Sequence, residues 1–168
     1  MKSPLLKPAP ESTTSSIAIG GHPLHPMLIT FPIAFLSGAL ASDLAYWWSG
    51  DPFWARASLW LVGSGLAMGL LAALAGMLDF MLIKEIRRHV TSWSHFLIAI
   101  MLLSLAATNW WLRIDDPARE ILPWGIYLSA VSTVALAVAG WLGGKLVFEH
   151  NIGSGEPEPD DGKEGEVL

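Results

Sequence analysis

Five histidines are the side chains of this sequence best suited to bind a metal ion or a cofactor: His22, His25, His89, His95 and His150. Neutral imidazoles can bind haem iron from both sides of the ring, and with a carboxylate they also bind zinc, iron, nickel or copper. The chain has no cysteine, which excludes a thiolate-ligated metal, a disulfide, a thiol nucleophile and a covalently attached c-type haem. The chemistry therefore depends on which elements bring the histidines together.

The composition indicates an integral membrane protein. Of the 168 residues, 52% are hydrophobic and only 15% are charged, against about a quarter in a soluble domain. The net charge of −5 is carried by the segment 151–168, whose acidic residues outnumber its single lysine by five, and the rest of the chain is neutral. No basic surface indicates binding to nucleic acid.

The spacing of the charged residues predicts four transmembrane helices. Uncharged stretches of 22 to 24 residues are long enough to cross a hydrocarbon core of about 30 Å. Short connections force neighbouring helices to be antiparallel, so we expect an all-α integral membrane four-helix bundle of up-down-up-down topology. The expected helices are 27–48, 57–83, 95–112 and 122–148, within a domain 21–150 that lies between a disordered leader, 1–20, and a disordered acidic tail, 151–168.

This topology brings all five histidines to one face of the membrane. His22 and His25 precede the first helix, His89 and His95 open the third, and His150 closes the fourth. Asp79, near the end of the second helix, reaches the same face. This convergence is the most informative feature of the sequence, and it depends on the number of helices being four.

Two helical faces carry small and polar residues that suit the interior of a bundle. On the second helix the face runs through Gly65, Gly69, Ala72, Gly76 and Asp79, and on the third through His95, Ala99, Leu102, Ala106 and Asn109. An inward carboxylate in a membrane is either a functional group or a buried structural hydrogen-bond acceptor, and the sequence leaves both open. The stripe on the second helix could equally serve dimerisation.

The segment Gly21-His22-Pro23-Leu24-His25-Pro26 has restricted backbone geometry. A residue that precedes proline avoids the α region, so we expect His22 and His25 to be extended and Pro26 to occupy the first helical position. Pro32 is expected to kink the first helix or to mark its true start. A continuous helix would place His25 and Asp43 on one face, five turns apart.

The flanking charges predict that both termini are cytoplasmic. In the short flanks of the helices, the face that carries the termini has five basic residues: Lys7, Lys84, Arg87, Arg88 and Lys145. The opposite face has three, Arg56, Arg113 and Arg119, and next to them a dense group of tryptophans: Trp47, Trp48, Trp54, Trp60, Trp110, Trp111 and Trp124. The predicted location is a multi-pass protein of the bacterial inner membrane.

Several of these motifs together resemble a bacterial membrane-protein family called domain of unknown function 2231. The resemblance covers residues 21–153 and rests on His22-Pro23-Leu24-His25-Pro26, Phe31-Pro32, Gly76-x-x-Asp79, His95, and Gly140-Trp141-Leu142-Gly143-Gly144 leading to His150. This chain has Ala99 where the family often has an asparagine. The resemblance implies a redox setting, with a Rieske-type or cytochrome electron-transfer partner.

Three functions remain open at this point. In the first, a b-type haem for electron transfer is bound by two of His25, His95 and His150. In the second, a transition-metal ion is bound for storage or transport by some of His22, His25, Asp79, His95 and His150. In the third, the chain is a structural or assembly subunit without a cofactor. A hydrolase is the least favoured class, and no catalytic residue is assigned, because the sequence has no nucleophile elbow or phosphate loop.

Overall fold

The computed structural model describes residues 15–152. The predicted leader up to residue 14 and the predicted tail from residue 153 lie outside the described residues. The elements are, in chain order, β1 (Ala18–Ile19), β2 (His22–Pro23), α1 (Leu24–Leu28), α2 (Thr30–Ser49), α3 (Pro52–Leu82), η1 (Ile86–Arg88), α4 (Val90–Arg113), α5 (Pro117–Glu120), η2 (Ile121–Gly125) and α6 (Ile126–Phe148).

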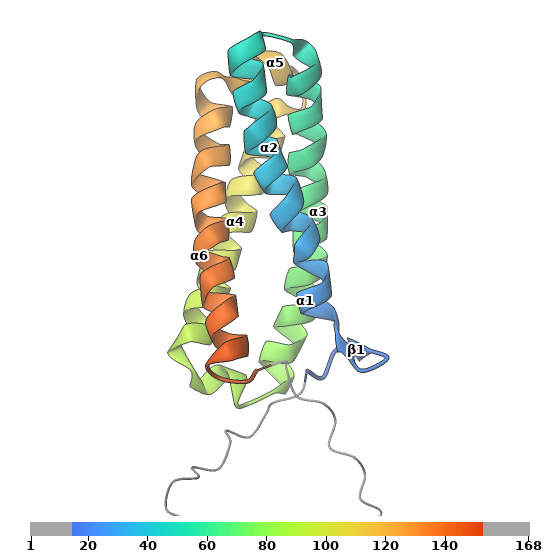
Figure 1. Ribbon diagram of the computed structural model, residues 1–168, viewed down its shortest axis with the longest axis vertical. Coiled ribbons are helices and arrows are strands. Elements are labelled where there is room, and N and C mark those ends of the chain that lie inside the picture. Colours follow the sequence, from blue (N-terminus) through green and yellow to red (C-terminus); the bar gives the residue numbers. More distant parts are fainter. Residues whose placement is uncertain (1–14, 153–168) are drawn as a thin grey trace, which may run out of the picture.

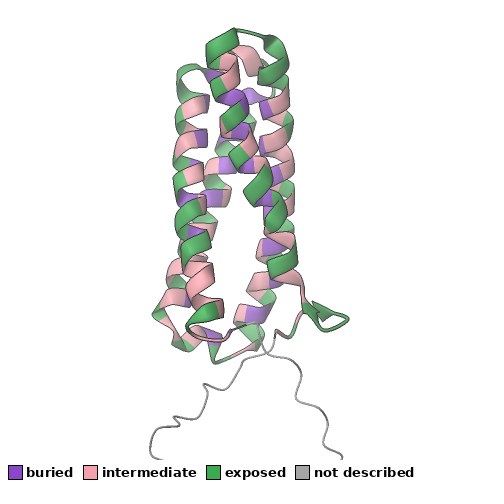
Figure 2. Cartoon of the chain, in the orientation of Figure 1, coloured by how far each residue is buried: buried purple, intermediate pink, exposed green. Residues whose placement is uncertain are grey.

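Four long apolar helical segments pack side by side and alternate in direction (Figure 1). The segments Leu24–Ser49, Pro52–Leu82, Val90–Arg113 and Pro117–Phe148 have 26, 31, 24 and 32 residues and are long and apolar enough to cross a membrane. The outer surfaces of the helices are largely exposed, and the buried residues lie along the inner faces (Figure 2). The predicted all-α four-helix membrane bundle is thus confirmed.

The second and third long helices begin five residues earlier than the sequence predicts, at Pro52 and Val90 instead of 57 and 95. For the second helix the prediction took the charge of Arg56 as the boundary, but a helix can continue past a charge that lies at its exposed end. The third helix instead begins with its uncharged stretch, directly after His89. Asp51 caps α3 by accepting a hydrogen bond from the Phe53 N–H at 2.9 Å, with Pro52 in the first turn. As a result His95 lies in the second turn of α4, inside the bundle.

Pro32 interrupts the first transmembrane segment, as predicted. Because Pro32 has no N–H, the carbonyl of Leu28 loses its helical partner, and the helix breaks at Ile29 between α1 and α2. α1 packs on α3, whereas α4 lies against α6 (Figure 1). The kink therefore directs the start of the chain toward α3.

The backbone of the His22–Pro26 segment differs in part from the prediction. His22 is extended in β2, but His25 is helical, because α1 already begins at Leu24 and Pro26 is its third residue. Proline is tolerated throughout the first turn of a helix, since the N–H groups there have no helical acceptor. The predicted extended conformation of His25 is therefore wrong.

The small-residue faces lie inside the bundle, as predicted. On α3 the residues Gly65, Gly69, Ala72 and Asp79 are buried and Gly76 is half-buried. On α4 the buried residues include Leu102, Ala106 and Asn109, and the central apolar cluster combines Leu36, Leu102, Ala106 and Ala135. The stripe on α3 is covered by helices of its own chain, so the argument that it serves dimerisation no longer holds.

At the end of the bundle where α2 and α4 end, here called the tryptophan end, a buried ion pair joins the helices. The Arg113 guanidinium donates to both carboxylate oxygens of Asp43, at 2.6 and 2.8 Å, and both side chains are fully buried. The hydroxyls of Ser58 and Ser129 donate to the same carboxylate at 2.5 and 2.6 Å. Arg113 Nε donates to the Asn109 side chain at 2.8 Å. The network thus connects α2, α3, α4 and α6.

The sequence analysis missed this network because it counted Arg113 as a charge of the membrane flank. Arg113 is instead turned into the bundle, where a Cβ atom on Gly125 would lie 2.8 Å from its Nη2. Asp43, the only charge in the first predicted helix, was the signal that an opposite charge had to lie on another helix.

Removing one partner of this ion pair is expected to destabilise the bundle more than removing both partners. Arg113→Met leaves a buried carboxylate without its counter-charge and should lower the free energy of unfolding by roughly 3–5 kcal/mol. The double variant Asp43→Leu/Arg113→Met leaves no buried charge of this pair, and its free energy of unfolding should fall by less than that of Arg113→Met. Unfolding in mixed detergent micelles, followed by circular dichroism, measures both.

Arg56→Met, on the exposed surface near the same end, is the matched control and should change stability by less than about 0.5 kcal/mol. If Arg113→Met behaves like Arg56→Met, the network does not stabilise the bundle.

Candidate functional site

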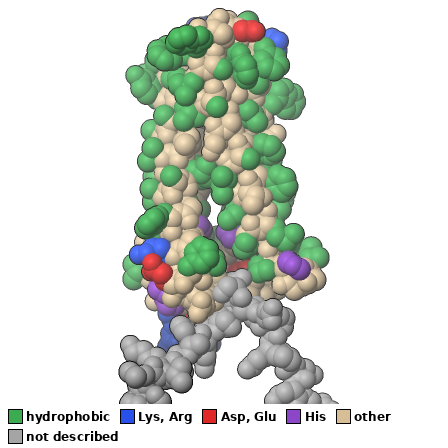
Figure 3. All heavy atoms as spheres, viewed as in Figure 1, with side chains coloured by type: hydrophobic (Ala, Val, Ile, Leu, Met, Phe, Trp, Pro, Cys, Tyr) green, Lys and Arg blue, Asp and Glu red, His purple; other side chains and the backbone are tan. Residues whose placement is uncertain are grey.

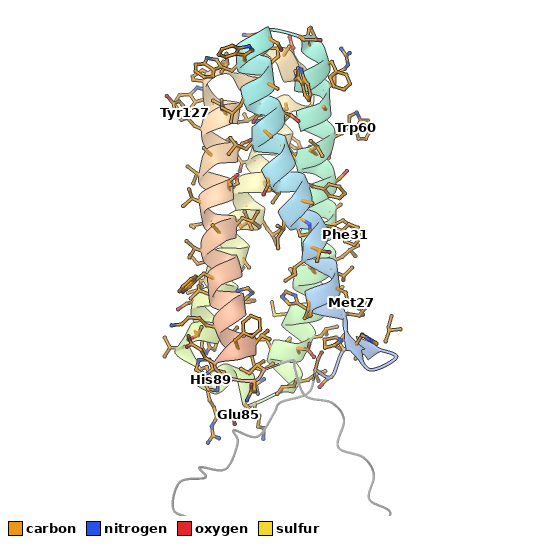
Figure 4. All side chains as sticks on the ribbon, viewed as in Figure 1. Met27, Phe31, Trp60, Glu85, His89 and Tyr127 are labelled. Atoms are coloured by element: carbon orange, nitrogen blue, oxygen red, sulfur yellow. The ribbon has the colours of Figure 1, made fainter. Side chains whose placement is uncertain are left out.

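All five histidines lie at the opposite end, where α3 ends and α4 begins, here called the histidine end. Figure 4 shows His89 and Glu85 there, with Trp60 and Tyr127 toward the tryptophan end. The convergence predicted from the topology is therefore present. The histidines do not form one cluster, however, because four of them form two pairs, and the exposed His22 ring is hydrogen-bonded to the carbonyl of Gly20, at 3.0 Å.

His25 is held by α3. Its Nδ1 lies 2.7 Å from the carbonyl oxygen of Ala72. A carbonyl oxygen can only accept a hydrogen bond, so Nδ1 carries the proton and Nε2 keeps its lone pair. The backbone of α3 thus fixes the His25 ring in the tautomer that can bind a metal through Nε2.

His95 is held in the same way by α6. Its Nδ1 lies 3.0 Å from the carbonyl oxygen of Ala139, which again assigns the proton to Nδ1. A backbone carbonyl that accepts the Nδ1 proton is a common support of histidines that bind metals. Two imidazoles on different helices therefore share one protonation pattern.

His25 and His95 face each other across the two halves of the bundle. Their ring centroids are 6.1 Å apart and the ring planes are nearly perpendicular, at 86°. In the space-filling view the surface is hollowed between the α1/α3 side and the α4/α6 side, with histidine side chains on both walls (Figure 3). The pair thus joins the two sides of the bundle at this end, His25 from α1 and His95 from α4.

Glycines lie next to both rings. A Cβ atom on Gly76 would lie 2.7 Å from His25 Nδ1, too close for any real contact, and one on Gly143 would lie 3.4 Å from His95 Cε1. Gly143 belongs to the Gly140–Gly144 segment that the sequence analysis singled out. At Gly76 the absence of a side chain is what allows the His25 ring to reach the carbonyl of α3, whereas a Cβ at Gly143 would meet His95 at an ordinary van der Waals distance.

His150 pairs with His89 and not with the other two predicted ligands. The His89 and His150 ring centroids are 4.3 Å apart, and His89 Nε2 is 3.9 Å from a Glu85 carboxylate oxygen. The chain turns back after α6, so that the Ile152 N–H bonds to the Leu146 carbonyl at 3.0 Å. This turn carries the His150 ring to the loop between α3 and α4. Of the three predicted ligands, of which two were expected to bind, the structure brings His25 and His95 together and pairs His150 with His89.

Asp79 is also engaged elsewhere. Its carboxylate accepts hydrogen bonds from Ser15, Ser16 and Ile17, the segment that precedes β1. Between residues 15 and 152 no group of three or more histidine and carboxylate side chains is arranged to hold a metal ion. The predicted joint site of His22, His25, Asp79, His95 and His150 is therefore not assembled in this part of the chain.

Substituting Gly76 by alanine is expected to displace His25. Gly76→Ala forces the imidazole or α1 to move and should lower the free energy of unfolding by about 1–3 kcal/mol, as overpacking does elsewhere. Gly140→Ala, where a Cβ meets nothing within 4 Å, is the control and should keep or slightly raise stability. Equal unfolding curves for the two variants would contradict the close packing of His25 on α3.

Comparison with known proteins gives a family and no activity. No curated protein and no solved structure matches the chain. The family described as "Predicted membrane protein (DUF2231)" matches residues 21–156, which include all four membrane-spanning segments. The chain belongs to this family of predicted multi-pass membrane proteins.

Proposed function

We propose that the chain is a small b-type haem protein for electron transfer, with His25 and His95 as the axial ligands. The observation that carries the proposal is the pair itself: two imidazoles from opposite halves of the bundle, each with its Nδ1 proton on a backbone carbonyl. Both rings thereby keep Nε2 free, which is the atom through which a histidine binds haem iron when Nδ1 is protonated.

The spacing of the two rings supports this assignment. Two imidazoles that bind one metal ion from opposite sides, with nitrogens about 2.0 Å from the metal, have ring centres about 6 Å apart. His25 and His95 are 6.1 Å apart, centre to centre. The separation of the two ring centres is thus the one that this proposal requires.

The surroundings of the pair also suit a flat macrocycle. The hollow between the two halves of the bundle widens toward the histidine end, and Gly76 and Gly143 border the two rings (Figure 3). Ser92 lies one turn before His95 on α4, and its buried hydroxyl has no hydrogen-bond partner among the described residues. An unpaired buried hydroxyl is costly, so a polar group of a bound molecule at this place would stabilise it.

A bound haem would supply one-electron chemistry. His25 and His95 would hold it, and the backbone carbonyls of Ala72 and Ala139 would fix the two imidazole tautomers. The partner in this proposal is a Rieske-type or cytochrome component. A non-haem ion is less favoured, because only two imidazoles face each other and a stable zinc or iron site takes three or four protein ligands.

The spectrum of the purified protein tests the haem proposal. Protein from haem-replete cells should show a Soret band, with α and β bands that sharpen on reduction with dithionite. His25→Ala and His95→Ala should each abolish the bis-imidazole spectrum. His22→Ala, His89→Ala and His150→Ala remove histidines from the same end of the bundle and should leave the spectrum unchanged.

Other outcomes reject the haem proposal. A colourless sample that contains stoichiometric metal, lost in His25→Ala, would indicate a non-haem ion site. A colourless and metal-free sample would indicate a structural or assembly subunit.

We also propose that both termini are cytoplasmic, in the inner membrane of a bacterium. Arg113 is buried and neutralised by Asp43, so it does not act as a loop charge. In the flanks counted from the sequence, this leaves five basic residues on the face expected to carry the termini, against Arg56 and Arg119 on the opposite face. This asymmetry is larger than the sequence alone indicates and favours a cytoplasmic histidine end.

Labelling of single cysteines tests this orientation, since the chain has none of its own. A membrane-impermeant maleimide should modify Asp115→Cys in intact spheroplasts, because Asp115 lies exposed in the loop after α4. Ile19→Cys, in the exposed hairpin at the histidine end, should react only after the membrane is permeabilised. The reverse pattern would contradict the orientation.

A further inference from the structure

Three residues on α3, between positions 72 and 79, support the start of the first transmembrane segment. Ala72 offers its carbonyl to the His25 ring, Gly76 leaves the space in which the ring lies, and Asp79 binds the chain that leads into α1. These residues are four and three positions apart and so lie on one face of the helix. The small-residue stripe therefore ends in a carboxylate on the same face that holds His25.

Asp79 makes three hydrogen bonds with a segment more than sixty residues away in sequence. Its Oδ2 accepts from the Ser15 hydroxyl at 2.5 Å, and its Oδ1 accepts from the N–H groups of Ser16 and Ile17 at 2.8 and 3.0 Å. The Asp79 side chain is buried, with the residue only 8% exposed. A buried carboxylate that accepts three hydrogen bonds is firmly held and is not available as a metal ligand.

The anchored segment is directly connected to His25. The Ile17 carbonyl accepts a hydrogen bond at 2.9 Å from the N–H of Leu24, the first residue of α1. Between them the short strands β1 and β2 pair, Ala18 with Pro23 and Ile19 with His22. Asp79, Ile17 and Leu24 thus form a continuous path of hydrogen bonds that ends one residue before His25.

We propose that Asp79 is a positioning residue for His25. By anchoring residues 15–17 on α3, its carboxylate fixes where α1 begins, and so holds the His25 ring against the Ala72 carbonyl with Nε2 directed away from α3. The positioning of His25 does not depend on what binds there, whereas its consequence for haem rests on the proposed function.

The first experiment uses the full chain without added haem, in lipid nanodiscs. Nitrogen NMR of ¹⁵N-histidine-labelled protein, with His25 assigned by comparison with His25→Ala, reports the tautomer of this ring. The wild type should show His25 protonated on Nδ1. Asp79→Asn should give a mixture of tautomers, and Glu85→Gln, an exposed carboxylate at the same end, should leave His25 unchanged.

A spin label on Ile19→Cys measures the anchoring itself. The label should become more mobile in Asp79→Asn, whereas a label on the exposed Val90→Cys at the start of α4 should not. If Asp79→Asn does not fold, Ser15→Ala removes one of the three donors and should produce the same two changes in weaker form. Unchanged tautomer and mobility in the folded variants would overturn the proposal, as would a mobile label with an unchanged His25 tautomer.

The second experiment separates this proposal from the haem proposal. If the wild type binds haem, Asp79→Asn should bind it roughly 10-fold more weakly, the usual cost of losing a group that supports a metal ligand. An unchanged haem affinity in a variant with an altered His25 tautomer would overturn the link to the ligand. If the wild type binds no haem, the proposed function fails, and the NMR and spin-label results alone decide the role of Asp79.

Discussion

The ion pair between Asp43 and Arg113 is the constraint on which the rest of this bundle depends. Both side chains are fully buried between the helices, and a buried charge that has lost its partner costs roughly 3–5 kcal/mol, so each side chain depends on the other. Their contact fixes the register of α2 against α4. Because the hydroxyls of Ser58 and Ser129 donate hydrogen bonds to the Asp43 carboxylate, α3 and α6 are fixed at the same level along the bundle. One polar network thus determines how four apolar helices, which have no hydrophobic reason to prefer one register in lipid, align with each other.

The histidine end is built on a different principle. There the helices are held by hydrogen bonds from imidazole rings to backbone carbonyls and by the contact of Asp79 with the chain before β1. The two imidazole contacts are each local to one half of the bundle: His25 is tied to α3, and His95 to α6. The stacked rings of Phe80 and Phe96 join α3 to α4 at this end, so that only the α1 and α6 sides stand apart. A bundle that is closed at the tryptophan end and joined on one side at the histidine end leaves space for a ligand without loss of its overall topology.

Helical periodicity and charge spacing were sufficient to predict the four helices, their alternating direction and the common end of the histidines. They also predicted the inward faces of α3 and α4, because small residues at helical spacing allow membrane helices to pack closely along that face. Two features depended on contacts between residues far apart in sequence and were missed. One is the turn after α6, which brings the His150 ring against His89 and lies beyond the end of the helical sequence pattern. The inward direction of Arg113 could be inferred only by pairing it with Asp43, 70 positions earlier.

That separation of 70 residues also has a consequence for biosynthesis. At roughly 5–20 residues per second, Asp43 leaves the ribosome about 4–14 seconds before Arg113 does. Throughout this interval α2 is a membrane segment with an acidic group and no basic partner; only Ser58, 15 residues later, is available to it. Nascent α2 therefore carries a carboxylate without its counter-charge until α4 arrives. The last two helices then determine when the network around the first is complete, and a chain truncated before Arg113 would lack the buried partner of Asp43.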